Sequence, residues 1–195
     1  MRKHRSGWAR ALTVTAVLVA AVIAGSASAL AQTGGSGPPG GTTSDPTVPT
    51  GVAGVATLAP DGSAIPPTDA PPTVRKAINA GNRIHTLPYI WGGGHNRKFK
   101  GRGYDCSGAV SYVLHAAGLL KSPMASGPLA RSWGAPGAGQ WITVYANKSH
   151  AYAVIAGLRW DTSAVGEALN QGSGPRWRAT QRSSVGYTSK YWPGY

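Results

Sequence analysis

The chain has 195 residues, 42% of them hydrophobic, so it can bury one core, although 28 Gly and 15 Pro indicate that much of it is loop or linker. Its formal net charge of +13 favours polyanionic partners, but no helix-turn-helix, zinc-finger or RNA-binding motif accompanies the charge, and we expect no nucleic acid among its partners. The single cysteine excludes an internal disulfide and a multi-cysteine zinc site.

Residues 1–31 have the three parts of a secretory signal peptide. Four basic residues fall within the first ten, and residues 11–25 form an uncharged, mostly apolar run. That run is shorter than the ~20 residues that span a bilayer. Small residues at 27–29 and at 29–31 offer two cleavage sites. An uncleaved membrane anchor is the alternative, and in either case the rest of the chain lies outside the cytoplasmic membrane. With the signal peptide, we expect a protein that is secreted or associated with the cell wall.

Residues 32–55 are rich in Gly, Pro, Ser and Thr and have almost no large apolar side chain. Such a segment buries too little surface to offset the entropy lost on ordering, so it is predicted to be a flexible linker. The folded domain is therefore predicted to cover residues 56–195. At its start, Leu58 and Ile65 suit an extended segment docked on the domain, although two Pro-Pro pairs argue against regular structure.

A first helix is predicted from Thr73, a suitable N-cap, to Ile84, because apolar residues recur there near helical spacing. Pro88 ends this stretch. Residues 89–91, Tyr-Ile-Trp, have the composition of a short strand, and three glycines follow. Residues 96–103 are predicted to form a basic loop flanked by glycine.

A second helix is predicted to begin at Cys106 and to stop at Gly118. Its apolar stripe continues from Cys106 through four residues at helical spacing: Val110, Val113, Leu114 and Ala117. Three strands are predicted later in the chain, over 140–146, 150–155 and 158–162. Helices followed by strands predict an α+β domain with helices packed on an antiparallel sheet.

Cys106 stands in the first turn of this second helix and on its apolar stripe. An isolated cysteine is more often a small buried apolar residue or an incidental thiol. Here, however, the helix N-terminus favours the thiolate, and the stripe directs the thiol toward the sheet. A thiolate in that place needs a base on the sheet, so Cys106 is the candidate nucleophile.

His150 is the best candidate for the base, because it opens an apolar strand, although a structural role is the common one for a lone histidine there. The other four histidines lie in the signal peptide, at a helix end, in a loop and off the apolar stripe of the second helix: His4, His85, His95 and His115.

Asp161 is the candidate acceptor that orients the base. If residues 156–157 form a two-residue hairpin turn, Tyr152 faces Asp161 across the two strands. Residues directly opposite share a sheet face, so His150 then lies diagonal to Asp161. A three-residue turn would reverse this parity and leave Asp161 as a solvated turn acid.

Three stretches together resemble the NlpC-type family of cell-wall peptidases. They are residues 88–93, Pro-Tyr-Ile-Trp-Gly-Gly, residues 104–108, Tyr-Asp-Cys-Ser-Gly, and residues 149–152, Ser-His-Ala-Tyr. Members of that family are papain-like cysteine hydrolases that act on bacterial peptidoglycan. The resemblance covers about residues 74 to 165 and implies a papain-like fold with its nucleophile at a helix N-terminus.

The resemblance also implies a role for each matching position. Cys106 matches the nucleophile, and its N–H would contribute to the oxyanion hole. His150 matches the general base, and Tyr89 matches a tyrosine that lines the site. Asp105 and Ser107 match residues that help to bind the peptide. The implied substrate is a peptidoglycan stem peptide cut beside D-glutamate, and we expect no cofactor, no metal and a monomer.

Departures from the family pattern keep other functions open. Asp161 stands where the family usually has His, Asn or Gln, Gly139-Gln140 replaces a Gly-Asp pair, and residues 172–195 do not match the usual ending. The alternatives are an amidase or acyltransferase that uses the same dyad, and a non-catalytic wall-binding module whose basic, Trp-containing tail forms the binding face. Anionic cell-wall polymers are further candidate partners.

Overall fold

A computed structural model describes residues 54–165 and 173–195 of the chain. The predicted signal peptide, and the predicted linker up to residue 53, lie outside the described residues. Within the two described ranges, no helix is long and apolar enough to cross a membrane.

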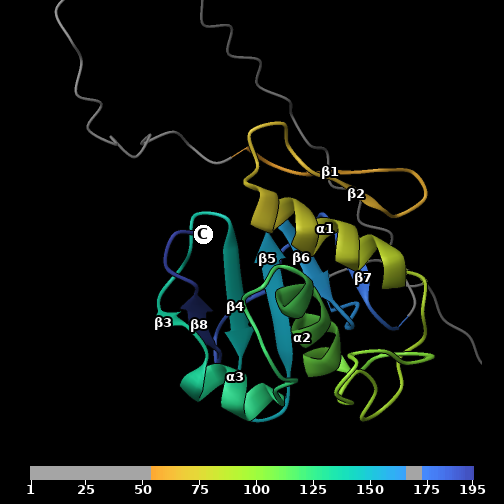
Figure 1. Cartoon of the computed structure of the whole chain (residues 1–195), viewed down its shortest axis with the longest axis vertical. Helices are drawn as coiled ribbons and strands as arrows, with labels where there is room; N and C mark the ends of the chain where they lie inside the picture. Colours follow the sequence, from red (N-terminus) through yellow and green to blue (C-terminus); the bar gives the residue numbers. More distant parts are fainter. Residues whose placement is uncertain (1–53, 166–172) are drawn as a thin grey trace, which may run out of the picture. The chain divides into compact units, whose positions relative to one another are not determined.

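The described residues fold into an α+β domain with a mainly antiparallel arrangement of strands (Figure 1). The helices are α1 (Pro72–Ile84), α2 (Cys106–Ala116) and α3 (Ser126–Ser132). A two-stranded sheet joins β1 (Thr57–Leu58) to β2 (Ala64–Ile65). A six-stranded antiparallel sheet has the order β3-β8-β4-β5-β6-β7, formed by β3 (Ala135–Pro136), β4 (Ile142–Ala146), β5 (Ala151–Ile155), β6 (Leu158–Asp161), β7 (Arg176–Arg178) and β8 (Thr188–Tyr191).

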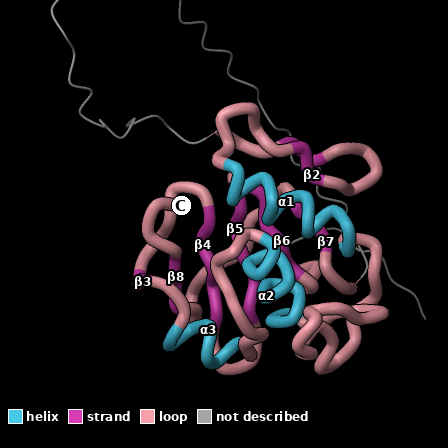
Figure 2. The backbone as a smooth tube through the Cα atoms, in the orientation of Figure 1, coloured by secondary structure: helices cyan, strands magenta, loops and turns pink. Residues whose placement is uncertain are grey.

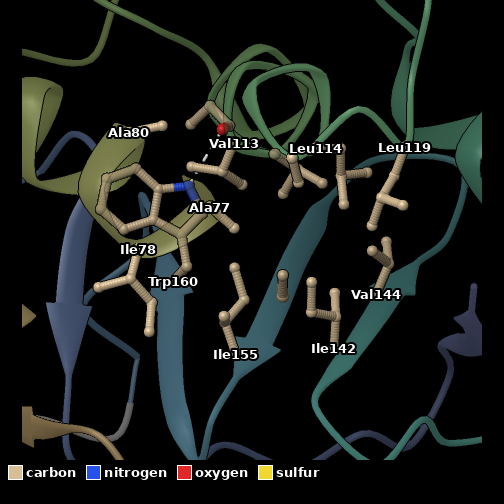
Figure 3. Close-up of a cluster of buried hydrophobic side chains, with 14 of the residues drawn as sticks. Ala77, Ile78, Ala80, Val113, Leu114, Leu119, Ile142, Val144, Ile155 and Trp160 are labelled. Atoms are coloured by element: carbon tan, nitrogen blue, oxygen red, sulfur yellow. Dashed lines mark hydrogen bonds between the residues drawn. The ribbon is translucent and has the colours of Figure 1, made fainter. Parts of the chain in front are cut away.

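The core lies between one face of this sheet and the pair of helices α1 and α2, which lie side by side over its central strands (Figure 2). Figure 3 shows how the two layers meet. Side chains from α1 and α2 point down onto Ile142, Ile155 and Trp160 of the sheet. Trp160 is fully buried, and its indole N–H donates to the carbonyl of Ala109 in α2 at 3.0 Å. This bond ties α2 to β6.

Replacing Trp160 with Phe is expected to lower the free energy of unfolding by about 1–3 kcal/mol. The change leaves the buried carbonyl of Ala109 without its donor and opens a small cavity. Urea unfolding followed by circular dichroism measures the loss. Trp192, which is partly exposed, provides the matched control, and a Trp192→Phe change as large as that at Trp160 would contradict the predicted effect.

Several predicted elements are confirmed. The helix from Cys106 is α2, and the three predicted strands are β4, β5 and β6, each shorter by one or two residues. The first helix is α1, but Thr73 is not its N-cap, because the helix begins at Pro72. The Thr73 hydroxyl instead donates to the hydroxyl of Tyr195 at 3.2 Å.

The turn between β5 and β6 has two residues, as the placement of Asp161 requires. Ile155 pairs with Leu158, so only Ala156 and Gly157 lie between the strands. Both have positive φ, 46° and 81°, which suits the twist of a tight hairpin. The register therefore puts Asp161 on the side of β6 opposite to Trp160.

One prediction about another segment is wrong. Residues 89–91 form no strand, because Tyr89 makes only an isolated bridge with Tyr104. The C-terminal tail, considered above as a binding face, supplies β7 and β8 to the sheet. Trp177 of β7 is buried against Trp160, with 4.7 Å between ring centroids, and Arg178 is buried as well.

Candidate active site

Cys106 is the first residue of α2, and its side chain is almost completely buried. Asp105 is the N-cap of this helix, and its carboxylate accepts a hydrogen bond from the N–H of Gly108 at 2.7 Å. The cap fixes the direction in which the helix starts. The thiol is therefore held at the positive end of the helix dipole, as the sequence predicted.

The glycines near the nucleophile allow a loop to lie directly on the start of α2. A Cβ at Gly108 would meet the carbonyl oxygen of Gly93 at 1.9 Å, so no larger residue fits there. That carbonyl also accepts from the N–H of Asp105 at 3.2 Å. This contact explains in physical terms why a glycine follows Ser107, whereas a Cβ at Gly93 would meet the carbonyl of Gly103 instead.

His150 comes from the short loop between β4 and β5. Asn147 shapes this loop, because its side-chain oxygen accepts from the N–H groups of Ser149 and His150, both at 2.9 Å. The carbonyl of His150 in turn accepts from the N–H of Asn147 at 3.0 Å. His150 is thus held immediately before β5 by a small turn that is closed by the side chain of Asn147.

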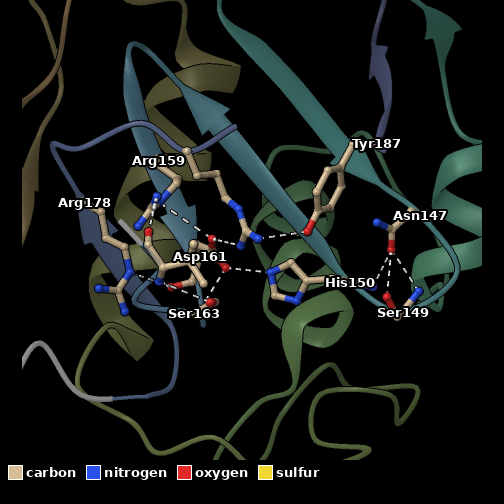
Figure 4. A network of polar contacts seen from close by, with 10 residues as sticks. Asn147, Ser149, His150, Arg159, Asp161, Ser163, Arg178 and Tyr187 are labelled. Atoms are coloured by element: carbon tan, nitrogen blue, oxygen red, sulfur yellow. Dashed lines mark hydrogen bonds and ion pairs between the residues drawn. The ribbon is translucent and has the colours of Figure 1, made fainter. Parts of the chain in front are cut away.

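The structure brings Cys106, His150 and Asp161 together. The Nε2 atom of His150 lies 2.8 Å from Oδ1 of Asp161 (Figure 4). Burial lowers the pKa of an imidazole, but the side-chain hydrogen bonds with Asp161 and Cys106 and the charges of these two residues raise the pKa of His150 to about 9. The imidazolium is therefore the stable form of His150 at neutral pH.

The side chain of Asp161 is completely buried and surrounded by donors. Oδ1 also accepts from the N–H of Ser163 at 2.9 Å, and Oδ2 accepts from Arg182 at 3.0 Å. Arg159 lies 3.6 Å from Oδ2. Burial alone would raise the pKa of Asp161, but the hydrogen bond with His150 and the other contacts hold it below its usual value.

The thiol opens onto a groove with a volume of about 610 Å³. Tyr89, Asp105 and Ser107, the predicted substrate-binding residues, all line it together with Cys106. Burial, reinforced by the nearby charges of Cys106 and Asp105, raises the pKa of Tyr89. The rest of the wall comes from the loop before α2 and from residues near α3 and His150: Trp91, His95, Ala125, Ser126, Lys148 and Ser149.

The carboxylate of Asp105 is already engaged within the protein. In addition to its bond with Gly108, it accepts from the N–H of Gly92 at 3.0 Å and from the hydroxyl of Ser107 at 3.1 Å. The Nε2 atom of His95 lies 3.0 Å from the same carboxylate. Asp105 therefore acts first as a support for the helix start and for the groove wall.

Three residues of the site escaped the sequence analysis: His95, Asn147 and Arg182. Asn147 could have been found, because Asn two residues before Ser149 and just before a strand is typical of a side-chain-closed turn. His95 was noted only as a loop residue. No local pattern distinguishes Arg182, which reaches Asp161 across 21 residues of sequence.

The described residues also bear on metal binding. Within residues 54–165 and 173–195, no three His, Cys, Asp or Glu side chains come together in a group that could hold a metal ion. The polar side chains of the site are instead bonded to one another.

Comparisons with known proteins add little to this geometry. No protein-family model matches the chain, and no curated protein is significantly similar to it. Among solved structures, the chain is similar to Rv1477, a hypothetical invasion protein of Mycobacterium tuberculosis. The two share 22% sequence identity over 61% of this chain and 63% of that chain, with a TM-score of 0.42. The aligned part spans less than two thirds of that protein.

Proposed function

We propose that the chain is an exported cysteine peptidase that hydrolyses amide bonds in peptidoglycan stem peptides. The observation that supports this most directly is that His150, which is hydrogen-bonded to Asp161, also lies close to Cys106, and that Cys106 lines a groove. A nucleophile, a base and an orienting acceptor in that order constitute the machinery of acyl transfer. In this proposal the domain is a papain-like thiol protease, with its nucleophile at a helix N-terminus.

The proposed reaction has two stages. The thiolate of Cys106 attacks the amide carbonyl, and the N–H of Cys106 helps to hold the developing oxyanion. His150 gives its Nδ1 proton to the leaving amine as the C–N bond breaks, which leaves a thioester. A water molecule then attacks the thioester, His150 accepts a proton from it, and the C–S bond breaks to release the carboxylic acid.

The substrate class rests on the three stretches that resemble the NlpC-type family and on the charge of the groove's surroundings. Four exposed cations follow His95 in a single loop: Arg97, Lys98, Lys100 and Arg102. The side-chain oxygen of Asn96 holds this loop by accepting from the N–H groups of Lys98 and Lys100. A basic loop beside the groove favours a substrate embedded in an anionic wall polymer. The predicted signal peptide is consistent with that location.

An amidase or an acyltransferase is the second candidate, because the same three residues serve either reaction. These enzymes differ in the bond that they break and in the group that receives the acyl fragment. A non-catalytic wall-binding module is less well supported now that Trp177 and Arg178 are buried in the sheet.

Incubation of the purified protein with defined muropeptides, followed by mass spectrometry, tests the proposal. We expect two fragments that arise from hydrolysis of the amide bond beside D-glutamate, with a summed mass that exceeds the mass of the intact muropeptide by one water. Cleavage between the sugar and the peptide would indicate an amidase, and an exchanged peptide would indicate an acyltransferase. Intact muropeptides after prolonged incubation would contradict all three enzymatic functions.

A further inference from the structure

The segment between β7 and β8, residues 179–187, reaches the base and the acid of the site from the C-terminal part of the chain. Arg182 donates from Nη1 to Oδ2 of Asp161 at 3.0 Å, and from Nη2 to the hydroxyl of Tyr187 at 3.0 Å. Its guanidinium carbon lies 5.1 Å from the ring centroid of Tyr152 and 5.3 Å from that of Tyr187. Only 12% of the Arg182 side chain is exposed.

The same segment also contacts the neighbourhood of His150. Asn147, which closes the turn around His150 with its oxygen, donates from its amide nitrogen to the carbonyl of Gly186 at 3.2 Å. The ring of Tyr187 meets the ring of His150 edge-on, with 6.3 Å between centroids. Segment 179–187 therefore contacts Asp161 through Arg182 and the neighbourhood of His150 through Gly186 and Tyr187, and Figure 4 shows Tyr187 near His150.

The geometry explains how Arg182 affects the contact between His150 and Asp161. A carboxylate can rotate about its Cβ–Cγ bond, and rotation would move Oδ1 of Asp161 away from His150. A planar guanidinium that is itself held between Tyr152 and Tyr187 presents its N–H groups in a fixed direction. Its hydrogen bond to Oδ2 opposes that rotation, and it keeps the buried carboxylate ionised beside the imidazolium.

We propose that Arg182 is a positioning residue that fixes the carboxylate of Asp161, and that segment 179–187 braces the His150–Asp161 pair against Cys106. The role rests on the proposed function, because it acts on the residues assigned to the reaction. Arg182 touches neither the thiol nor the groove lining, so its effect reaches Cys106 through Asp161 and His150.

Alkylation of Cys106 by iodoacetamide, followed from pH 5 to pH 9 on the full chain, tests this role without any peptidoglycan substrate. In the wild type we expect Cys106 to react faster at pH 6 than a free thiol, because a fixed imidazolium stabilises the thiolate. In Arg182→Gln the acidic limb of the plot of alkylation rate against pH should shift to higher pH by about one unit. At pH 6 the reaction would then be about tenfold slower. Arg182→Lys keeps the charge without the planar fork, and its limb should also move up.

Gln181→Ala is the matched control, because it removes a hydrogen bond of the same segment, from Gln181 to the carbonyl of Gly157, away from Asp161. Its profile should superimpose on that of the wild type. Should Arg182→Gln fail to fold, Tyr187→Phe removes the support of Arg182 and leaves its bond to Asp161, and a smaller shift in the same direction is expected.

The proposed role of Arg182 is wrong if the acidic limb of the pH profile of Arg182→Gln superimposes on that of the wild type or moves to lower pH. The same outcomes count against it in Tyr187→Phe, where that variant replaces Arg182→Gln. It is equally overturned if Arg182→Lys matches the wild type, or if Gln181→Ala shifts as far as Arg182→Gln. A wild type that shows the expected limb and shift but cleaves no muropeptide would refute the proposed substrate and leave the brace standing. The two ideas therefore fail separately.

Discussion

Replacing Cys106 with alanine is expected to abolish amide hydrolysis while the domain stays folded. The chain has no second thiol, so nothing else in the site can form the thioester. The capping bond from Gly108 to Asp105 does not involve the Cys106 side chain, and α2 should therefore begin at the same residue. We expect muropeptide turnover to fall to the rate measured without protein, with an unchanged far-ultraviolet circular dichroism spectrum.

Cys106→Ser provides the closest control, since it keeps nearly the same volume and replaces the thiol by a hydroxyl. A hydroxyl is ionised far less readily than a thiol, and this variant should be inactive as well. Both variants should still bind the muropeptide, because the groove walls are unaltered. Turnover by Cys106→Ala above the blank would refute the assignment of the nucleophile.

Replacing Asp161 with asparagine is expected to reduce turnover by about 10²–10⁴-fold, the range typical of losing an oriented acid–base group. The amide has the shape of the carboxylate but not its charge, so it supports the His150 imidazolium poorly. It also places an NH₂ group where either His150 or Arg182 requires an acceptor. Asp61→Asn, at an exposed acid outside the site, should leave turnover unchanged.

The same substitution should change how stability depends on pH. The folded-state pKa of His150 is about 9, above the ordinary value of 6.5, so folding favours the protonated ring. That contribution is fully present below pH 6.5 and is lost as the pH rises toward 9. In Asp161→Asn the pKa of His150 should fall, and the decline in unfolding free energy over this window should disappear.

Urea unfolding of the wild type and of Asp161→Asn at pH 6.5 and at pH 9 measures the difference. The pKa of Asp161 is lowered by folding, so its own contribution is present above its ordinary value of 3.8 and does not vary in this window. An equal decline with and without Asp161 would show that the carboxylate does not set the protonation of His150.

The local parts of this fold follow from the sequence. The 3.6-residue spacing after Cys106 predicts α2, and the Ala156-Gly157 pair between two apolar runs predicts the hairpin that aligns Asp161 with His150. Both depend on residues close together in the chain. For this reason a single sequence was sufficient to propose the three central residues of the site.

The parts of the fold that depend on contacts between residues far apart in the chain do not follow from the sequence. β7 and β8 carry no clear alternation, and their burial comes from contacts with strands far away in the chain, such as Trp177 on Trp160. Arg182 is one of 19 basic residues, and only the folded chain shows which of them reaches Asp161. The tail consequently resembled an exposed basic surface, whereas it supplies strands and supports for the site.

Because the turn at Ala156-Gly157 has only two residues, a change in its length would affect the site. Exposed hairpin tips usually tolerate inserted residues, since the strands on either side keep their pairing. Here one added residue that shifted the pairing would carry Asp161 to the other face of the sheet and put Thr162 or Trp160 in its place beside His150. In this chain, the number of residues between His150 and Asp161 therefore matters to their contact as much as the identity of the two residues does.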